Sequence, residues 1–157
     1  MKWANQVLFR FLLEADGDIY NLTAWDRGWS IHKIVNHLVV AQDRYVSRLS
    51  GLHTIEDKWE PCTKAGMQNL ATRSLKNDEK LINLASIENK LLSFNQNGNV
   101  VNFHASTVLA QSIHHATEHR AQIDDILSFK GAVNLNLDSI DIWSFDRQIN
   151  LGKNSDF

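Results

Sequence analysis

The sequence is poor in cysteine and proline, carries no surplus of positive charge and lacks long apolar runs. One cysteine, Cys62, in 157 residues rules out an internal disulfide and leaves imidazole and carboxylate groups as the ligands of any metal. The net charge of −2 and the lack of Lys/Arg-rich blocks argue against nucleic-acid and membrane-surface partners. No apolar run approaches the roughly 18 residues of a membrane helix, and no signal-peptide pattern is present. We therefore expect a cytoplasmic protein without nucleic-acid or membrane partners.

The composition that remains is that of a folded globular domain. Apolar residues make up 43% of the chain and charged residues 22%, which argues against disorder. A chain of 157 residues is long enough to bury a core within one domain. We assign residues 1–150 to this domain and residues 151–157 to a C-terminal tail.

Apolar residues recur with helical spacing in four long stretches. The second stretch begins at Ser30, a good N-cap because its hydroxyl can accept a free backbone N–H. The third has a weaker pattern, and Asn77-Asp78-Glu79 can interrupt it. The predicted helices are residues 1–15, 30–50, 63–85 and 104–129, with a short helix or helical turn at 138–150.

Residues 87–103 differ from the helical stretches. Two short apolar runs, Leu91–Phe94 and Val100–Phe103, flank an Asn-Gly pair at 97–98, a dipeptide that favours a hairpin turn. We predict a short hairpin or an ordered loop here. The fold class predicted for the whole chain is an all-α four-helix bundle, with long connectors that allow a crossover topology.

A histidine pair lies in the fourth predicted helix, within the run Ser112–Gln122, which contains no Gly or Pro. His115 and His119 are four residues apart, so one stands above the other on a helix face with about 6 Å of rise between them. With this spacing a helix offers two imidazoles to one metal ion. Both lie where an apolar face turns polar, as expected at the rim of a cavity between helices.

A third candidate ligand, His37, flanks the apolar stripe of the second predicted helix. Burying three neutral imidazoles together is costly unless they share a partner, and a divalent metal supplies one. Three imidazoles with an open position suit zinc, nickel, cobalt or ferrous iron. The alternative is that His115 and His119 make ordinary hydrogen bonds on a helix surface, and that His37 is a satisfied helix residue.

The residues around the pair include no obvious general base, so the catalytic residues are unassigned. Gln122 can line a cavity, and Arg120 is expected in a structural ion pair. Asp124 and Asp125 can accept a hydrogen bond from an imidazole N–H, although surface solvation is the simpler interpretation. Of the remaining histidines, two are spare candidates, His104 and His114, and two have no support, His32 and His53.

Two runs resemble motifs of the DinB/YfiT-like superfamily of metalloenzymes. Trp29 with the following Ser30–Leu38 resembles its second-helix motif, and His114–Gln122 resembles its fourth-helix motif. Smaller signatures near the two ends are matched by Trp3-Ala4-Asn5 and by Leu137-Asp138 with Trp143.

The resemblance covers most of the chain, and only residues 51–103 carry no motif. The sequence departs from the family pattern in two places. Glu118 stands where many members have His, at a position that is not a ligand. The Pro-Pro often found before the Leu-Asp is absent, and Asn134 and Asn136 occupy that region. Neither departure affects the three candidate ligands.

The resemblance implies a four-helix bundle of DinB type, usually a homodimer, with a divalent metal held by three histidines. Carried over position by position, these are His37, His115 and His119. Relatives include thiol-dependent S-transferases and isomerases that use low-molecular-weight bacterial thiols. The resemblance therefore implies a small-molecule substrate and a low-molecular-weight thiol as cosubstrate.

Two functional hypotheses follow. The first is a metal-dependent enzyme, of thiol-dependent S-transferase type or a hydrolase, in which the metal lowers the pKa of a thiol or a water and so supplies a nucleophile at neutral pH. The second is a non-catalytic, stress-related protein that binds a metal or a small molecule. The lack of a clear general base favours the second hypothesis.

Overall fold

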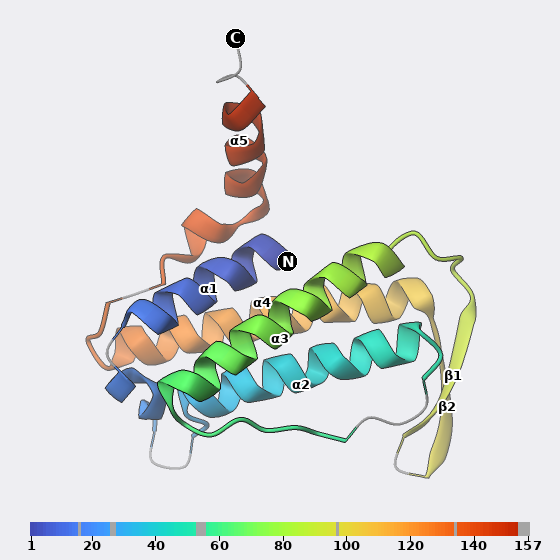
Figure 1. The fold of residues 1–157 in the computed structure, drawn as a ribbon, viewed down its shortest axis with the longest axis horizontal. Helices are drawn as coiled ribbons and strands as arrows, with labels where there is room; N and C mark the ends of the chain where they lie inside the picture. The colour runs from blue at the N-terminus through green and yellow to red at the C-terminus, as the bar shows by residue number, and fades with distance from the viewer. Residues whose placement is uncertain (16, 26–27, 53–55, 97, 134, 154–157) are drawn as a thin grey trace.

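The computed structural model describes residues 1–157 except 16, 26–27, 53–55, 97, 134 and 154–157. Most of the described chain is helical, with one small antiparallel sheet (Figure 1), so the predicted all-α class is confirmed apart from this sheet. In chain order the elements are α1 (Lys2–Glu14), η1 (Gly17–Asn21), α2 (Ile31–Leu49), α3 (Lys64–Leu84), β1 (Leu91–Gln96), β2 (Asn99–His104), α4 (Ala105–Phe129), η2 (Leu137–Ile140) and α5 (Ile142–Lys153).

The two central helices begin where the sequence provides a cap. Ser30 Oγ accepts the Lys33 N–H at 3.2 Å before α2, and Thr63 Oγ1 accepts the Gly66 N–H at 3.0 Å before α3. Gly66 is also required by close packing, because a Cβ there would lie 2.1 Å from the carbonyl oxygen of Pro61. The predicted starts of both helices are thus confirmed.

α3 runs without a break through Asn77-Asp78-Glu79, so the predicted interruption is wrong. Asn77 and Asp78 are buried, and both are hydrogen-bonded to other helices. Asn77 Nδ2, for example, donates to Asp43 Oδ1 of α2 at 2.7 Å. These two polar side chains therefore lie on the inner face of α3, where residues of neighbouring helices satisfy their hydrogen bonds.

The segment between α3 and α4 forms a hairpin, one of the two predicted possibilities. β1 pairs antiparallel with β2 in a register that sets Leu91 opposite His104 and Gln96 opposite Asn99. Gly98, beside the turn, has a φ of +84°, which glycine adopts without a Cβ penalty. β2 leads directly into α4, so the hairpin fixes where that helix begins.

The four long helices lie together, and in Figure 1 α3 crosses in front of α4 while α2 lies below both. α2 packs against both of these helices, and α1 packs against α3. In Figure 1, α2 and α3 run in the same direction, so the connector between them returns along the length of the molecule. Direct packing of α2 on α4 is the feature that positions the candidate site.

The C-terminal part projects away from the other helices (Figure 1). α5 extends to Lys153, three residues beyond the predicted end of the domain at 150, and the rest of the predicted tail lies outside the described residues. Ile142 and Trp143 on α5 are largely exposed. None of the described helices combines the length and apolar character that crossing a bilayer requires.

Candidate metal centre

Three histidines from two helices meet between α2 and α4. His37 lies in the first half of α2, and His115 and His119 lie on successive turns of α4. One ring nitrogen from each lies within 4.8 Å of the other two. The structure thus brings together all three residues that the sequence singled out. Their role as metal ligands stays a prediction.

The distances between the ring nitrogens fit a shared ion. His115 Nε2 lies 3.1 Å from His37 Nε2 and 3.1 Å from His119 Nε2. Two nitrogens that each lie about 2.1 Å from one ion are about 3.4 Å apart at a tetrahedral angle and about 3.0 Å apart at a right angle. The observed spacing falls between these values, so the three imidazoles can hold one divalent ion.

The electrostatic environment keeps two of these imidazoles neutral. Burial, together with the His119 and His37 rings, lowers the pKa of His115 from 6.5 to about 4. The pKa of His37 is lowered by burial, by His119 and by Arg44, and Asp57 opposes this shift. A neutral imidazole has the free lone pair that a metal requires, so little proton release need accompany binding at neutral pH.

Gln122 orients the third ring. Its Oε1 lies 2.7 Å from His119 Nδ1, and an amide oxygen can only accept, so Nδ1 carries the proton and donates. Nε2 of His119 is then left with its lone pair facing the other two rings. This arrangement is the one in which a metal-ligating histidine is held by an outer hydrogen bond.

Removing that bond is expected to weaken metal binding without removing a ligand. Gln122→Ala should lower zinc affinity about 10–100-fold, because His119 loses the acceptor that sets its tautomer and ring orientation. Gln122→Glu, which keeps an acceptor, should retain most of the affinity. Competition against a chromophoric chelator measures both values, with Gln148→Ala on the exposed face of α5 as the control. An affinity of Gln122→Ala within threefold of the unmodified protein would contradict this role.

Two aromatic rings that the sequence analysis did not assign to the centre flank it. Trp29 packs edge-on against His37 with ring centroids 5.0 Å apart, and Tyr45 packs edge-on against His115 at 5.9 Å. Trp29 is 41% exposed, whereas Tyr45 is buried and its pKa is raised mainly by that burial. Trp29 therefore forms an outer wall of the centre and Tyr45 an inner one. Tyr45 belongs to the buried face of α2, and its spacing in the sequence carries no sign of its contact with α4.

A charged pair lies near His37. Arg44 donates to Asp57 from Nε at 3.1 Å and also from its Nη2 atom. Both side chains are substantially exposed, so the pair contributes little to stability. Asp57 is the carboxylate that acts to raise the pKa of His37, and both of its oxygens already accept from the Arg44 guanidinium.

The other histidines lie outside the centre or outside the described chain. His104 and His114 are exposed, which removes them as spare ligands in this conformation. His32 Nε2 lies 3.0 Å from the Glu60 carbonyl oxygen and 2.9 Å from Asn36 Nδ2, so it links α2 to the connector that precedes α3. His53 lies outside the described residues.

Two further expectations around the pair need correction. Arg120 makes no ion pair within the described part of the chain. It is buried, and it donates to Asn5 Oδ1 at 2.7 Å and to Thr117 Oγ1 at 3.0 Å. Asp124, for which surface solvation was expected, is partly buried, and it does not accept from an imidazole. Its Oδ1 accepts the Leu135 N–H at 2.8 Å, while Asp125 is exposed as the simpler interpretation expected.

The fold and the geometry define a helical protein with a candidate three-histidine metal centre. A comparison with known families matches residues 1–144 to the DinB family. Because this match covers most of the chain, the protein belongs to the DinB family. A search of curated proteins finds no match. Family membership and the three converging imidazoles are both compatible with metal binding.

Proposed function

We propose that this DinB-family protein is a metal-dependent enzyme that holds one divalent ion with His37, His115 and His119. The observation that carries the proposal is the convergence of the three Nε2 atoms, with two spacings of 3.1 Å. Zinc, nickel and ferrous iron all suit three imidazole ligands. We propose a thiol-dependent S-transferase or a hydrolase, acting on a small electrophilic molecule.

The residues around the centre would have different roles in the reaction. A bound divalent ion would lower the pKa of a thiol or a water and so supply a nucleophile at neutral pH. Gln122 holds the His119 ring, and Tyr45 limits water on the inner side. Trp29, partly exposed, offers an apolar surface on which a substrate can rest. Gln122 thus orients the His119 ring, and Trp29 is the partly exposed side chain beside His37.

A non-catalytic binding protein, stress-related in the family context, is the second candidate. One observation favours it: Asp57, the carboxylate whose charge acts on His37, is engaged by Arg44 and is not free to move a proton. Such a protein would use the same three histidines to bind a metal or a small molecule without turnover.

Metal content and thiol-dependent turnover together test the proposal. The untagged protein should contain, or take up, about one equivalent of zinc, nickel or iron per chain. With a low-molecular-weight thiol and a chloronitroarene electrophile, an S-transferase should show turnover that a chelator removes and metal restores. Ester hydrolysis without thiol would indicate the hydrolase instead. Metal binding without either activity would support the binding protein, and no metal uptake would refute the centre itself.

Family membership is also the basis on which we propose the helix topology, the domain bounds, the oligomeric state and the cellular location. We propose that α1–α4 form a DinB-type four-helix bundle with a crossover between α2 and α3, supported by the packing of α2 on both α3 and α4. We also propose a single domain over residues 1–150, a homodimer and a cytoplasmic location. The exposed Ile142 and Trp143 supply apolar area that a second copy could bury, and a lone cysteine suits a reducing compartment.

A further inference from the structure

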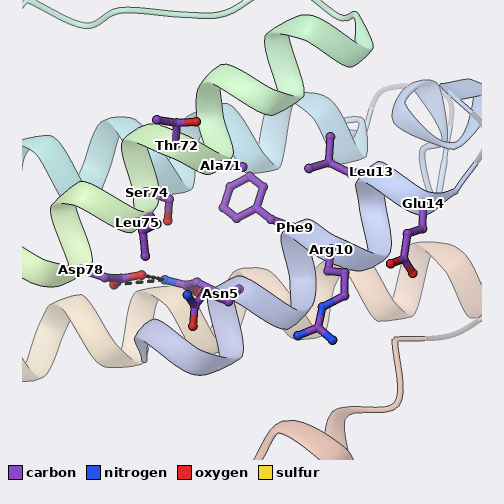
Figure 2. Close-up of a pocket in the computed structure, with 11 residues that line it drawn as sticks. Asn5, Phe9, Arg10, Leu13, Glu14, Ala71, Thr72, Ser74, Leu75 and Asp78 are labelled. Atoms are coloured by element: carbon purple, nitrogen blue, oxygen red, sulfur yellow. Dashed lines mark hydrogen bonds between the residues drawn. The ribbon is translucent and has the colours of Figure 1, made fainter.

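A second candidate binding site lies between α1 and α3, outside the metal centre. It is a cleft of about 420 Å³, within the usual size range of small-molecule sites. Figure 2 shows Asn5, Ser74 and Asp78 toward one end of the cleft and Leu13 and Glu14 toward the other. None of the three candidate metal ligands lines it.

The polar end of the cleft contains a buried hydroxyl without a protein partner. Ser74 is 1% exposed, and among the described residues no group hydrogen-bonds to its Oγ. A helical Ser or Thr commonly bonds back to the carbonyl four residues earlier, as Thr72 does to Gln68 at 3.0 Å. Ser74 does not, and in Figure 2 its side chain points from α3 toward α1. A buried polar group of this kind needs a partner, and a ligand in the cleft can supply one.

Asp78 lies one helical turn beyond Ser74 and gives this end its charge. Its carboxylate accepts from Asn5 Nδ2 at 3.0 and 3.3 Å and from Gln42 Nε2 at 3.0 Å, which leaves lone-pair capacity on Oδ2. The positive groups that act on this carboxylate, the Met1 amino group, Arg120 and Lys2, do not line the cleft. The end of the cleft therefore offers acceptors and negative charge, which selects a cationic donor.

The rest of the cleft is mostly apolar, and its lining also includes one positively and one negatively charged side chain. Phe9 and Ala71 lie in its middle in Figure 2, with Leu13 beyond them. Arg10 and Glu14 also line it and offset each other, so Asp78 leaves a formal charge of −1 on the lining. A ligand with a ring or short alkyl body would match the apolar middle while its charged end reached Asp78.

We propose that this cleft binds a small primary amine with an apolar body, whose ammonium group donates to Ser74 Oγ and Asp78 Oδ2. The site is separate from the metal centre and goes beyond the proposed enzyme function. It would make the protein a receptor for an amine, with a ligand seated between two helices of the core.

Titration of the full-length protein with 2-phenylethylamine tests the site. Calorimetry should give saturable one-to-one binding, and amide NMR shifts should concentrate on α1 and α3. The neutral isostere 2-phenylethanol should bind at least roughly tenfold more weakly, because it lacks the charge-assisted bond, and phenylacetate should not bind. Equal binding of all three compounds, or no saturable binding of the amine, would overturn the proposal.

Matched variants locate the binding. Ala71→Leu fills the middle of the cleft and should abolish binding, whereas Ala71→Ser leaves the space open and should retain it. Ser74→Ala should weaken binding roughly tenfold, and it serves as the deciding variant if Ala71→Leu does not fold. His115→Ala should leave amine binding unchanged. Loss of amine binding in His115→Ala would place the amine at the metal centre and refute the cleft, whatever the outcome for the proposed enzyme.

Discussion

His115→Ala is expected to abolish stoichiometric metal binding. His115 Nε2 is the atom common to both 3.1 Å spacings, so its loss removes the central one of three ligands. The affinity should fall by more than the roughly 10–100-fold that loss of an outer hydrogen-bond partner costs. Elemental analysis after dialysis, with a chelator competition for the residual affinity, measures the effect. Thiol-dependent turnover, where present in the unmodified protein, should disappear with the metal.

The same substitution should not harm the fold of the metal-free protein. Without metal, His115 is a desolvated imidazole facing two others, which is an unfavourable arrangement. Zinc at about 1,000 times its Kd should raise the free energy of unfolding of the unmodified protein by about 4 kcal/mol and leave that of His115→Ala unchanged. His114→Ala, an exposed histidine on the same helix, is the control and should respond to zinc normally. Full metal content in His115→Ala would refute the three-histidine centre.

Arg120→Met is expected to be strongly destabilising. Arg120 belongs to a buried network to which each long helix contributes one residue, namely Asn5 of α1, Gln42 of α2, Asp78 of α3 and Arg120 of α4. Asn5 lies between the two charges, donating to Asp78 and accepting from Arg120. Removing the guanidinium leaves the buried Asn5 Oδ1 without its donor and takes away one of the positive charges that act on the Asp78 carboxylate, at a cost of about 3 kcal/mol. Urea denaturation gives the change in the free energy of unfolding.

A double substitution separates the effect of charge from that of packing. In Arg120→Met with Asp78→Asn, the buried negative charge is gone while an amide oxygen can still accept from Asn5 and Gln42. The double variant should therefore recover about 1–3 kcal/mol relative to Arg120→Met alone. Arg10→Met, at an exposed position of α1, should change stability by less than about 0.5 kcal/mol. A double variant less stable than the single one would show that the uncompensated charge is not the cause.

This buried network also affects the position of the candidate metal centre, because Arg120 is adjacent in sequence to His119. Arg120 directly follows His119, and its hydrogen bond to Asn5 ties this turn of α4 to α1, while its bond to Thr117 lies within α4. The histidine pair is thereby presented by a turn that is tied to the core. The buried network and the candidate metal centre therefore share one turn of α4, although they use different side chains.

Local features of the fold were readable from the sequence. The hydroxyl cap at Ser30 starts α2 as predicted, because an N-cap acts through residues only three positions away. The Asn-Gly pair at 97–98 favoured the hairpin for a similarly local reason. His115 and His119 share a face through the helical period alone. Each of these predictions needed only neighbouring residues.

The misreadings arose where a partner comes from elsewhere in the chain. Asn77 and Asp78 suggested a break in α3 because Asn and Asp have low helix propensity. They are instead inner residues, since α1 and α2 bring amides and a carboxylate to them. Arg120 was expected in an ion pair, and an asparagine 115 positions away takes the place of the anion. No local pattern encodes such pairings.

The sequence by itself determined that α4 carries two imidazoles on one face and that a third candidate, His37, lies beside the stripe of α2. Only the tertiary structure decided that they meet. His37 and His115 are 78 residues apart, and the 3.1 Å between their Nε2 atoms depends on α2 packing directly on α4. By contrast, the hydrogen bond between His119 and Gln122 is local, because the two residues are three positions apart on α4, whereas the acceptance of the Leu135 N–H by Asp124 was again decided only by the tertiary structure. The physical reason is the same in each case: the helical period sets directions along one helix, whereas distances between helices are set by the packing of the whole core.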